Sequence, residues 1–284
     1  MTTATPATNT TVPDRPTTGS ALKRFTALAR AESLQFVRNK TLLINATVVP
    51  MAFALVMYFI QSGNDEASKV DAAAAAMEYF LLFALMFVQF YTVLSMVTTR
   101  RDEGVLKRLR TGESRDVEIL AASSVPGAVL TIVFTAVIAV LLMGLGAPGP
   151  VNVVPIIASV VLGLAVVSGL ALVTSGFTKN AEAAQITSMP VMLLLFASMG
   201  IFRQLYPDTV AEIVDRTPFA LIFDLAQYGW AGNTMVDRIT EGGAAPLESG
   251  AVLTETWQMM LMLAVWAAVC LWAGAKYVKW DVRH

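Results

Sequence analysis

The side chains best suited to chemistry are gathered in one short stretch, residues 99–116. Six of its residues are basic, and they are Arg100, Arg101, Lys107, Arg108, Arg110 and Arg115. Long apolar runs flank the stretch, one ending near Val97 and the next beginning near Ile119. A basic loop between two apolar membrane segments faces the cytoplasm under the positive-inside bias. We therefore expect these residues to bind a cytoplasmic partner through their charge and shape.

The same stretch has the pattern of a short amphipathic helix. Val105, Leu106 and Leu109 share one face of a helix over residues 102–110, and the basic side chains point elsewhere. We expect this helix to place Leu106 and Leu109 in a groove of another protein. The alternative is a solvated basic loop that only fixes the topology.

Catalytic and metal-binding patterns are absent from the sequence. Cys270 is the only cysteine and His284 the only histidine, which excludes an internal disulfide, a thiolate cluster and histidine-based catalytic or zinc motifs. No glycine-rich phosphate loop of the G-x-x-x-x-G-K-[ST] type occurs, so the chain should not bind ATP by itself. We therefore predict a protein that is not an enzyme and that binds no metal and no cofactor.

The elements that position the basic stretch are membrane helices. Hydrophobic residues make up 56% of the 284 residues and charged residues 14%, against about 25% in soluble domains. Roughly 20 apolar residues suffice to cross a bilayer. Six runs have that length, and they predict an all-α integral membrane protein with spans at about 42–60, 77–98, 119–145, 151–175, 184–202 and 256–276.

Two segments precede the first span. Residues 1–19 are rich in Thr, Pro and Ala, which predicts a disordered tail before a membrane domain of residues 20–284. Residues 20–40 predict a moderately amphipathic helix on the inner leaflet, although Glu32 and Leu34 interrupt its pattern. An ordinary soluble lead-in helix is the alternative.

The distribution of basic residues predicts the orientation. With both termini in the cytoplasm, 16 of the 20 Lys and Arg residues lie on the cytoplasmic side. The sequence thus predicts a multi-pass protein of the cell membrane.

The segment between the last two spans contains a third kind of element. Residues 218–232 are strongly apolar but too few to cross a bilayer, and Asp224 interrupts them. We interpret this piece as a short re-entrant helix buried against the bundle. The alternative is a soluble extracellular cap helix.

Taken in order, these features resemble the membrane permease of type-2 ABC exporters, most closely the daunorubicin-resistance type. The resemblance implies that the helix after the second span is a coupling helix that docks on the ATPase. Its matching positions are Glu103, Gly104, Leu106, Lys107, Arg108, Leu109 and Arg110. A second cytoplasmic turn, before the fifth span, is matched by Asn180, Glu182 and Gln185. The family also has a pair of short re-entrant helices between its last two spans.

The resemblance further implies the partners. Two permease chains would pair, as a homodimer or as a heterodimer with a similar permease, in a lipid bilayer. Two copies of a separate ATPase would dock beneath them, and those subunits would bind ATP and Mg. No nucleic-acid partner is predicted.

The cargo implied is a hydrophobic or amphipathic compound such as a drug, lipid or glycolipid. Aromatic and methionine side chains within the spans suit such a path, namely Phe53, Met57, Phe83, Phe87, Met192 and Phe196. Each of them alternatively faces lipid or packs in the bundle. Two other functions stay open: a polysaccharide or glycan exporter permease, and a membrane sensor or scaffold that transports nothing.

Overall fold

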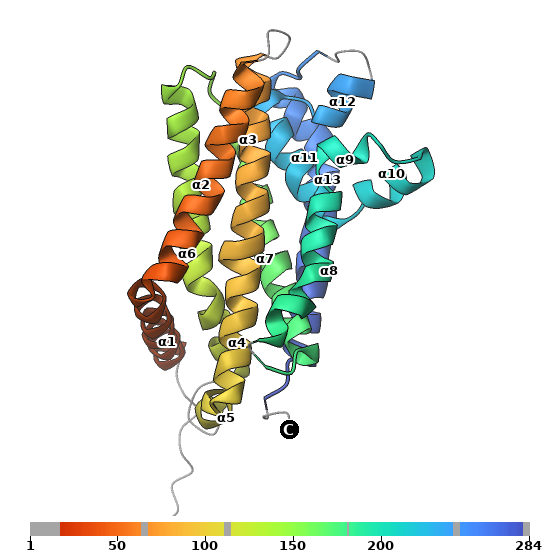
Figure 1. Cartoon of the computed structure of the whole chain (residues 1–284). Helices are drawn as coiled ribbons and strands as arrows, with labels where there is room; N and C mark the ends of the chain where they lie inside the picture. The colour runs from red at the N-terminus through yellow and green to blue at the C-terminus, as the bar shows by residue number, and fades with distance from the viewer. Residues whose placement is uncertain (1–17, 64–67, 111–114, 181, 241–244, 281–284) are drawn as a thin grey trace, which may run out of the picture.

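The computed structural model describes residues 18–63, 68–110, 115–180, 182–240 and 245–280, and every regular element among them is a helix. The long helices stand side by side in one bundle (Figure 1). In chain order the helices are α1 (Thr18–Arg38), α2 (Lys40–Ser62), α3 (Lys69–Phe83), the π-helix η1 (Ala84–Tyr91), α4 (Thr92–Asp102), α5 (Val105–Arg110), α6 (Asp116–Gly144), α7 (Val153–Phe177), α8 (Ala183–Ala197), α9 (Gly200–Arg203), α10 (Asp208–Asp215), α11 (Pro218–Ala231), α12 (Met235–Thr240) and α13 (Ser249–Tyr277). Residues 1–17 of the predicted tail lie outside the described residues.

The membrane character of the fold is confirmed by its helices. Four of the described helices are long and apolar enough to cross a bilayer, and these are Lys69–Asp102, Asp116–Gly144, Val153–Phe177 and Ser249–Tyr277. Two shorter apolar helices, Ala46–Ser62 and Ala183–Ala197, coincide with the first and fifth predicted spans. The chain is thus an all-α integral membrane protein, and the count of six spans stays a prediction.

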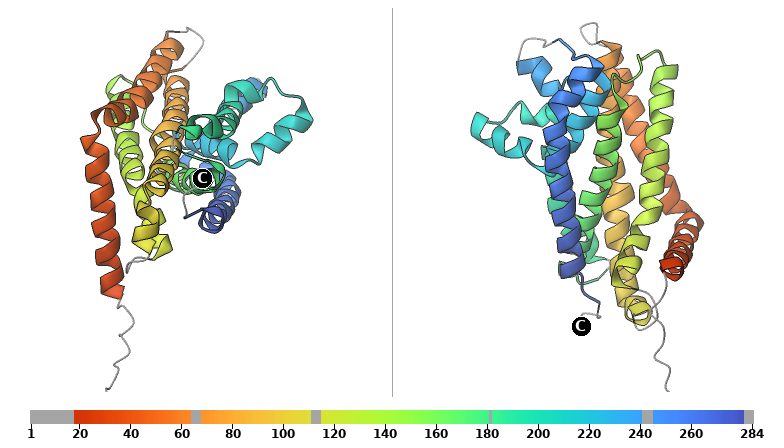
Figure 2. Two further views of the ribbon diagram at one scale, coloured as in Figure 1. Left: turned by 60° about the horizontal axis from the view of Figure 1, so that its bottom comes forward. Right: turned by 180° about the vertical axis from the view of Figure 1, so that it is seen from behind.

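The four long helices differ in burial, which distinguishes the helices at the centre of the bundle from those at its outside. In the continuous helix α3–η1–α4, 78% of the most apolar window is buried, and in α7 the share is 61%. The shares for α6 and α13 are only 28% and 22%. These two helices therefore lie at the outside of the bundle, where Figure 2 shows them from behind. Their exposed apolar side chains are the surface that a bilayer would cover.

The second long helix begins earlier than its sequence pattern predicts. The sequence pattern placed the start of the second span at Met77, whereas α3 begins at Lys69. A capping box starts α3, because the Ser68 hydroxyl accepts from the Asp71 backbone N–H at 3.2 Å and the Asp71 carboxylate accepts from the Ser68 N–H at 3.4 Å. The alanines that follow are buried in the bundle, so the helix is extended by two turns.

The fifth predicted span is shorter than expected. We expected it to run to Phe202, but α8 ends at Ala197. The break lies at Met199, whose backbone is extended and which begins the separate short helix α9. The Tyr206 hydroxyl donates to the Ala197 carbonyl at 2.9 Å, which satisfies one of the carbonyls left open at the end of α8.

Glycines bring α7 and α13 into direct backbone contact. A Cβ built on Gly169 would lie 2.4 Å from the carbonyl carbon of Cys270, and one built on Gly274 would lie 2.8 Å from the Gly169 carbonyl oxygen. Only a residue without a side chain fits this approach, as in other small-residue contacts of membrane helices. The close contact fixes α13 against the central helix α7.

The short helix α11 lies inside the bundle rather than above it. Thirteen of its 14 residues are buried, and it packs on α3, α7 and α13. Its Asp224 pairs with Arg203 of α9 at 2.8 Å, and its Gln227 donates to the buried carboxylate of Glu78 on α3. Glu78 also accepts from the Gly200 N–H at 2.9 Å. These contacts agree with the interpretation of a buried helix, and its depth in a membrane stays a prediction.

Candidate docking site at the basic end of the bundle

The basic stretch lies at one end of the bundle, together with α1 and the turn between α7 and α8 (Figure 1). The sequence pattern predicted one continuous helix over residues 102–110, but the structure contains a break in it. Helix α4 ends at Asp102, and α5 begins at Val105 after a break at Gly104, which has φ 68°. Glycine adopts this left-handed conformation without the steric cost that a Cβ adds, and it is the common residue at such a helix end. The break sets the direction of α5 relative to the long helix before it.

The leucines of α5 face inward, toward the chain's own core, and their contact with a partner stays a prediction. Only 1% of Leu106 is exposed, and Leu109 is partly buried against the same core. The sequence pattern identified the apolar face correctly but not its neighbour, because the ends of α4 and α6 supply the surface that this face covers. Lys107, Arg108 and Arg110 are exposed instead. Helix α5 therefore presents positive charge to the outside.

Three contacts hold the outer face of α5 in place. The Arg110 guanidinium pairs with Asp116 at 3.2 Å and lies over the Trp280 ring at 4.9 Å. Arg108 donates to the Glu103 carbonyl oxygen at 3.2 Å. Both arginines remain exposed while making these contacts, so their charge is still presented at the surface of the bundle.

Arg101 is the functional candidate that the sequence analysis missed. Its side chain has no exposed surface, although it lies in the most polar part of the chain. The guanidinium donates to the carbonyl oxygens of Ser175 at 2.8 Å, Thr178 at 2.7 Å and Lys179 at 3.0 Å. These carbonyls belong to the C-terminal end of α7, where helix carbonyls lack partners and the dipole favours a cation. Arg101 thereby joins α4, just before α5, to the turn between α7 and α8.

The three residues predicted for that turn lie on its surface. Asn180, Glu182 and Gln185 are all exposed at the same end of the bundle as α5. The Asn180 side-chain oxygen accepts from the Ala183 N–H at 2.8 Å, which supports the start of α8. The structure thus brings the two predicted docking segments to one end and connects them through Arg101.

Helix α1 is tied to this end by two ion pairs. Arg24 donates to both carboxylate oxygens of Glu118 on α6, at 3.1 and 3.3 Å. Glu32, which interrupted the amphipathic pattern, is buried and pairs with Arg100 of α4. The departure from the pattern at Glu32 was the one signal in the sequence for this contact. Figure 2 shows α1 lying at an angle to the long helices.

Four of the six residues predicted for a cargo path contact one another in the structure, and their role stays a prediction. The Phe53 and Phe83 rings stack with centroids 4.1 Å apart, and Phe83 also meets Phe87 at 6.0 Å and Phe196 at 6.1 Å. We call these four residues the aromatic cluster. They come from α2, α3, η1 and α8, and 43% of Phe53 and 36% of Phe87 are exposed. Met57 and Met192 are partly buried on α2 and α8 without a ring contact to the cluster.

The domain consists of membrane helices, with a short basic helix between two of the long ones. This architecture is that of a multi-pass membrane protein. The chain's family follows from a second finding: residues 62–276, about three quarters of the chain, match the model of the family described as ABC-2 family transporter protein. The chain therefore belongs to the ABC-2 transporter family and is a permease subunit of an ABC transporter. Membership implies association with an ATPase subunit and with a membrane. A search of the curated proteins finds no match.

The break at Gly104 leads to a first prediction. Alanine at this position meets no atom within 4 Å, so its only cost is the left-handed backbone, about 1 kcal/mol. We expect Gly104→Ala to lower the thermal stability of the purified chain slightly and to weaken binding of the ATPase by redirecting α5.

The matched control for this substitution is Gly144→Ala at the end of α6. A Cβ there also meets no atom within 4 Å, but the backbone is not left-handed. This variant should melt at or above the wild-type temperature, because alanine favours a helix over glycine. Equal behaviour of the two variants would contradict a conformational role for Gly104.

Proposed function

We propose that the chain is the permease of an ATP-driven exporter of a hydrophobic or amphipathic compound, of the daunorubicin-resistance type. Membership of the ABC-2 family supports this proposal most strongly. A separate ATPase would bind at the basic end of the bundle, with both termini of the permease in the cytoplasm of the cell. The ATP and Mg would be held by that ATPase.

Docking would depend on charge rather than on buried leucines. The exposed Lys107, Arg108 and Arg110 favour an acidic groove on the ATPase, since complementary potentials raise association rates and select partners. Asn180, Glu182 and Gln185 form a second, polar contact on the same end. With two permease chains, as a homodimer or a heterodimer, two ATPase subunits would be engaged.

Arg101 would transmit a movement of the ATPase to the membrane helices. Displacement of α5 acts on α4 through the Gly104 junction. The three hydrogen bonds of Arg101 then carry it to the end of α7 and the turn that starts α8. The ion pair between Arg100 and Glu32 brings α1 along. A push at one site would thus shift three helices together.

The aromatic cluster is the proposed contact for cargo. Stacked rings with partly exposed faces bind flat apolar groups by offset stacking and edge contacts. Met57 and Met192 would extend this surface along α2 and α8 with adaptable side chains. Aromatic rings also favour sugars, so a glycan exporter is the second candidate and the transport assay must include a glycolipid.

The test is reconstitution with an ATPase encoded beside this chain. The two proteins are co-purified, placed in liposomes and supplied with ATP, and movement of a fluorescent amphipathic dye or glycolipid across the membrane is measured. The variant Lys107→Glu/Arg108→Glu/Arg110→Glu should bind the ATPase roughly 100-fold more weakly, because like-charge contacts cost several kcal/mol.

The control for charge reversal is Arg216→Glu, because Arg216 is also exposed but lies beside the middle of α13, where its carbonyl accepts from the Trp266 indole at 3.1 Å. It should leave the affinity for the ATPase unchanged. If the triple variant binds the ATPase as tightly as wild type, the docking proposal is contradicted. If no probe moves across the membrane when ATP is supplied, the exporter proposal is contradicted.

A further inference from the structure

A narrow apolar crevice separates α6 from α7 on the outside of the bundle. Its volume is about 450 Å³, within the range of pockets that hold small ligands. The floor is formed by Met77 of α3 and Trp230 of α11, neither of which has exposed surface. Ile132, Ile157 and Val161 at the rim are about half exposed. The crevice thus runs from the surface of the domain to its core.

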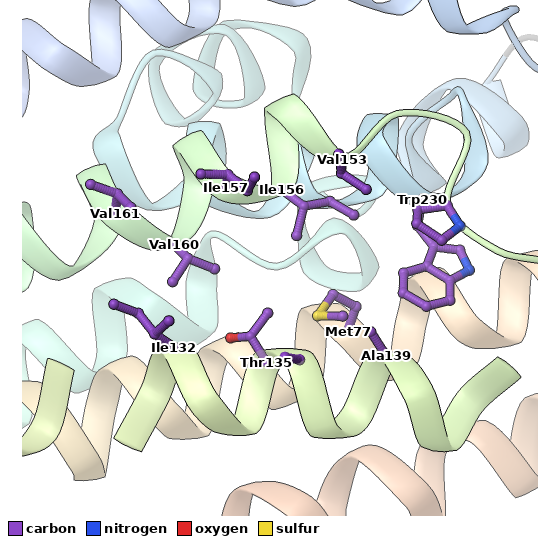
Figure 3. Close-up of a pocket in the computed structure, with 12 residues that line it drawn as sticks. Met77, Ile132, Thr135, Ala139, Val153, Ile156, Ile157, Val160, Val161 and Trp230 are labelled. Carbon is purple, nitrogen blue, oxygen red and sulfur yellow. The ribbon is translucent and has the colours of Figure 1, made fainter. Parts of the chain in front are cut away.

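Two facing rows of side chains give the crevice an elongated form (Figure 3). On α6 the row is Ile132, Thr135, Ala136 and Ala139, which lie on successive turns of one face. The opposite row is five residues of α7 between Val153 and Val161. At 1.5 Å rise per residue, each row is roughly 10–12 Å long. The small side chains of α6 leave the space between the rows unfilled.

The walls offer almost nothing for a polar ligand. Apart from Thr135 and the indole of Trp230, every side chain that lines the crevice is hydrocarbon or thioether. The Thr135 hydroxyl donates to the Thr131 carbonyl oxygen at 2.7 Å and is therefore already engaged. The Trp230 indole N–H is buried and has no hydrogen-bond partner among the described residues, but it is the one open polar group in a wall that is otherwise apolar. Water or a polar group would lose most of its hydrogen bonds here, so the crevice favours a hydrocarbon chain.

The bilayer around the crevice would supply such a hydrocarbon chain. The crevice opens beside α6, the surface of which is mostly exposed and apolar and would face the bilayer. Within hydrocarbon the driving force is not release from water but close packing, and an unfilled crevice loses those contacts. We propose that one acyl chain of a bilayer phospholipid occupies this crevice as a bound lipid. The two walls of the crevice are α6 and α7, whereas the aromatic cluster comes from α2, α3, η1 and α8.

A basic side chain lies where the headgroup of that lipid would be. Lys69 begins α3 two turns before Met77, roughly 12 Å along the helix. Its ammonium nitrogen lies against Gly146 in the connection from α6 to α7, 3.0 Å from where a Cβ would be. Lys69 is exposed and forms no ion pair with any other described residue. It is thus available to a lipid phosphate at the end of the bundle opposite α5.

The test uses Trp230 as a reporter in the wall of the crevice. The purified chain is reconstituted in bilayers that contain phosphatidylcholine brominated in mid-chain, and tryptophan quenching is measured. The contribution of Trp230 is the difference between wild type and Trp230→Phe. We expect that contribution to be quenched, with saturation at a small fraction of brominated lipid. Ala139→Phe, which fills the crevice, should reduce the quenching at least several-fold.

Val140→Phe is the matched control, because Val140 neighbours Ala139 but is 64% exposed and does not line the crevice. It should leave the quenching unchanged. If Ala139→Phe does not fold, Thr135→Leu narrows the same crevice and should have the same effect. Equal quenching in the filled and control variants would overturn the proposal, as would quenching by a brominated detergent alone. Displacement of the quenching by an added cargo would assign the crevice to cargo and overturn it as well.

Discussion

Replacing Arg101 with alanine is expected to unfold the basic end of the bundle partially and to uncouple the ATPase from transport. The substitution leaves three carbonyl oxygens at the end of α7 without the donors that the buried guanidinium supplies. Hydrogen bonds to charged groups contribute about 1.5–3 kcal/mol each, so a loss of about 3 kcal/mol or more in stability follows. The measurement is the unfolding temperature of the purified chain, together with ATP hydrolysis and transport in liposomes.

Two further variants make the Arg101 experiment specific. Arg101→Lys keeps the charge but not the fork of donors, so its stability should lie between those of wild type and Arg101→Ala. Arg30→Ala removes an exposed arginine of α1 and should leave the unfolding temperature unchanged. The proposed connection between α4 and α7 is refuted if Arg101→Ala melts and transports like Arg30→Ala.

Gly169→Ala is expected to separate α13 from α7. The added Cβ would lie 2.4 Å from the Cys270 carbonyl carbon and 2.7 Å from the Leu271 nitrogen, and backbone atoms cannot rotate away. Overpacking of this kind costs about 1–3 kcal/mol. Cys270, the only cysteine, lies at the contact and is 5% exposed. Its labelling by a membrane-permeable thiol reagent should therefore become markedly faster in the variant.

Gly163→Ala is the control for this prediction, because it adds the same methyl group to the same helix. There the nearest atoms are side-chain carbons of Ile222 and Leu85, at 3.2 and 3.3 Å, and both can shift. Labelling of Cys270 should stay close to the wild-type rate. Similar rates in the two glycine variants would show that the α7–α13 contact is not set by backbone proximity.

Much of the fold could be predicted from the sequence because its cause is local. Long apolar runs must form helices in a bilayer, where each backbone polar group needs an internal partner. All four long helices lie where these runs predicted them, apart from their ends. The end at Lys69 was missed because alanines carry little hydropathy signal, and the Ser68–Asp71 capping box was not recognised. The end at Ala197 was missed because nothing in the apolar run marks the turn at Met199.

Some features of the candidate site could likewise be predicted from the sequence, and others could not. The basic character of α5, its position after the second long helix and its helical state followed from residue types and spacing. The inward direction of Leu106 did not, since it depends on the ends of α4 and α6 that lie against it. The role of Arg101 was hidden for a different reason, because its three acceptors are more than 70 residues away in the chain.

By itself, the sequence determined the properties that belong to short stretches: apolar membrane helices, a short basic helix and the absence of a phosphate loop. Only the tertiary structure decided which faces are covered. It turned Leu106 of α5 inward and left the basic side chains exposed, gathered four phenylalanines into the aromatic cluster and left the crevice between α6 and α7 open. The physical reason is that burial and packing depend on neighbours distant in the chain, whereas hydropathy and charge are carried by each residue.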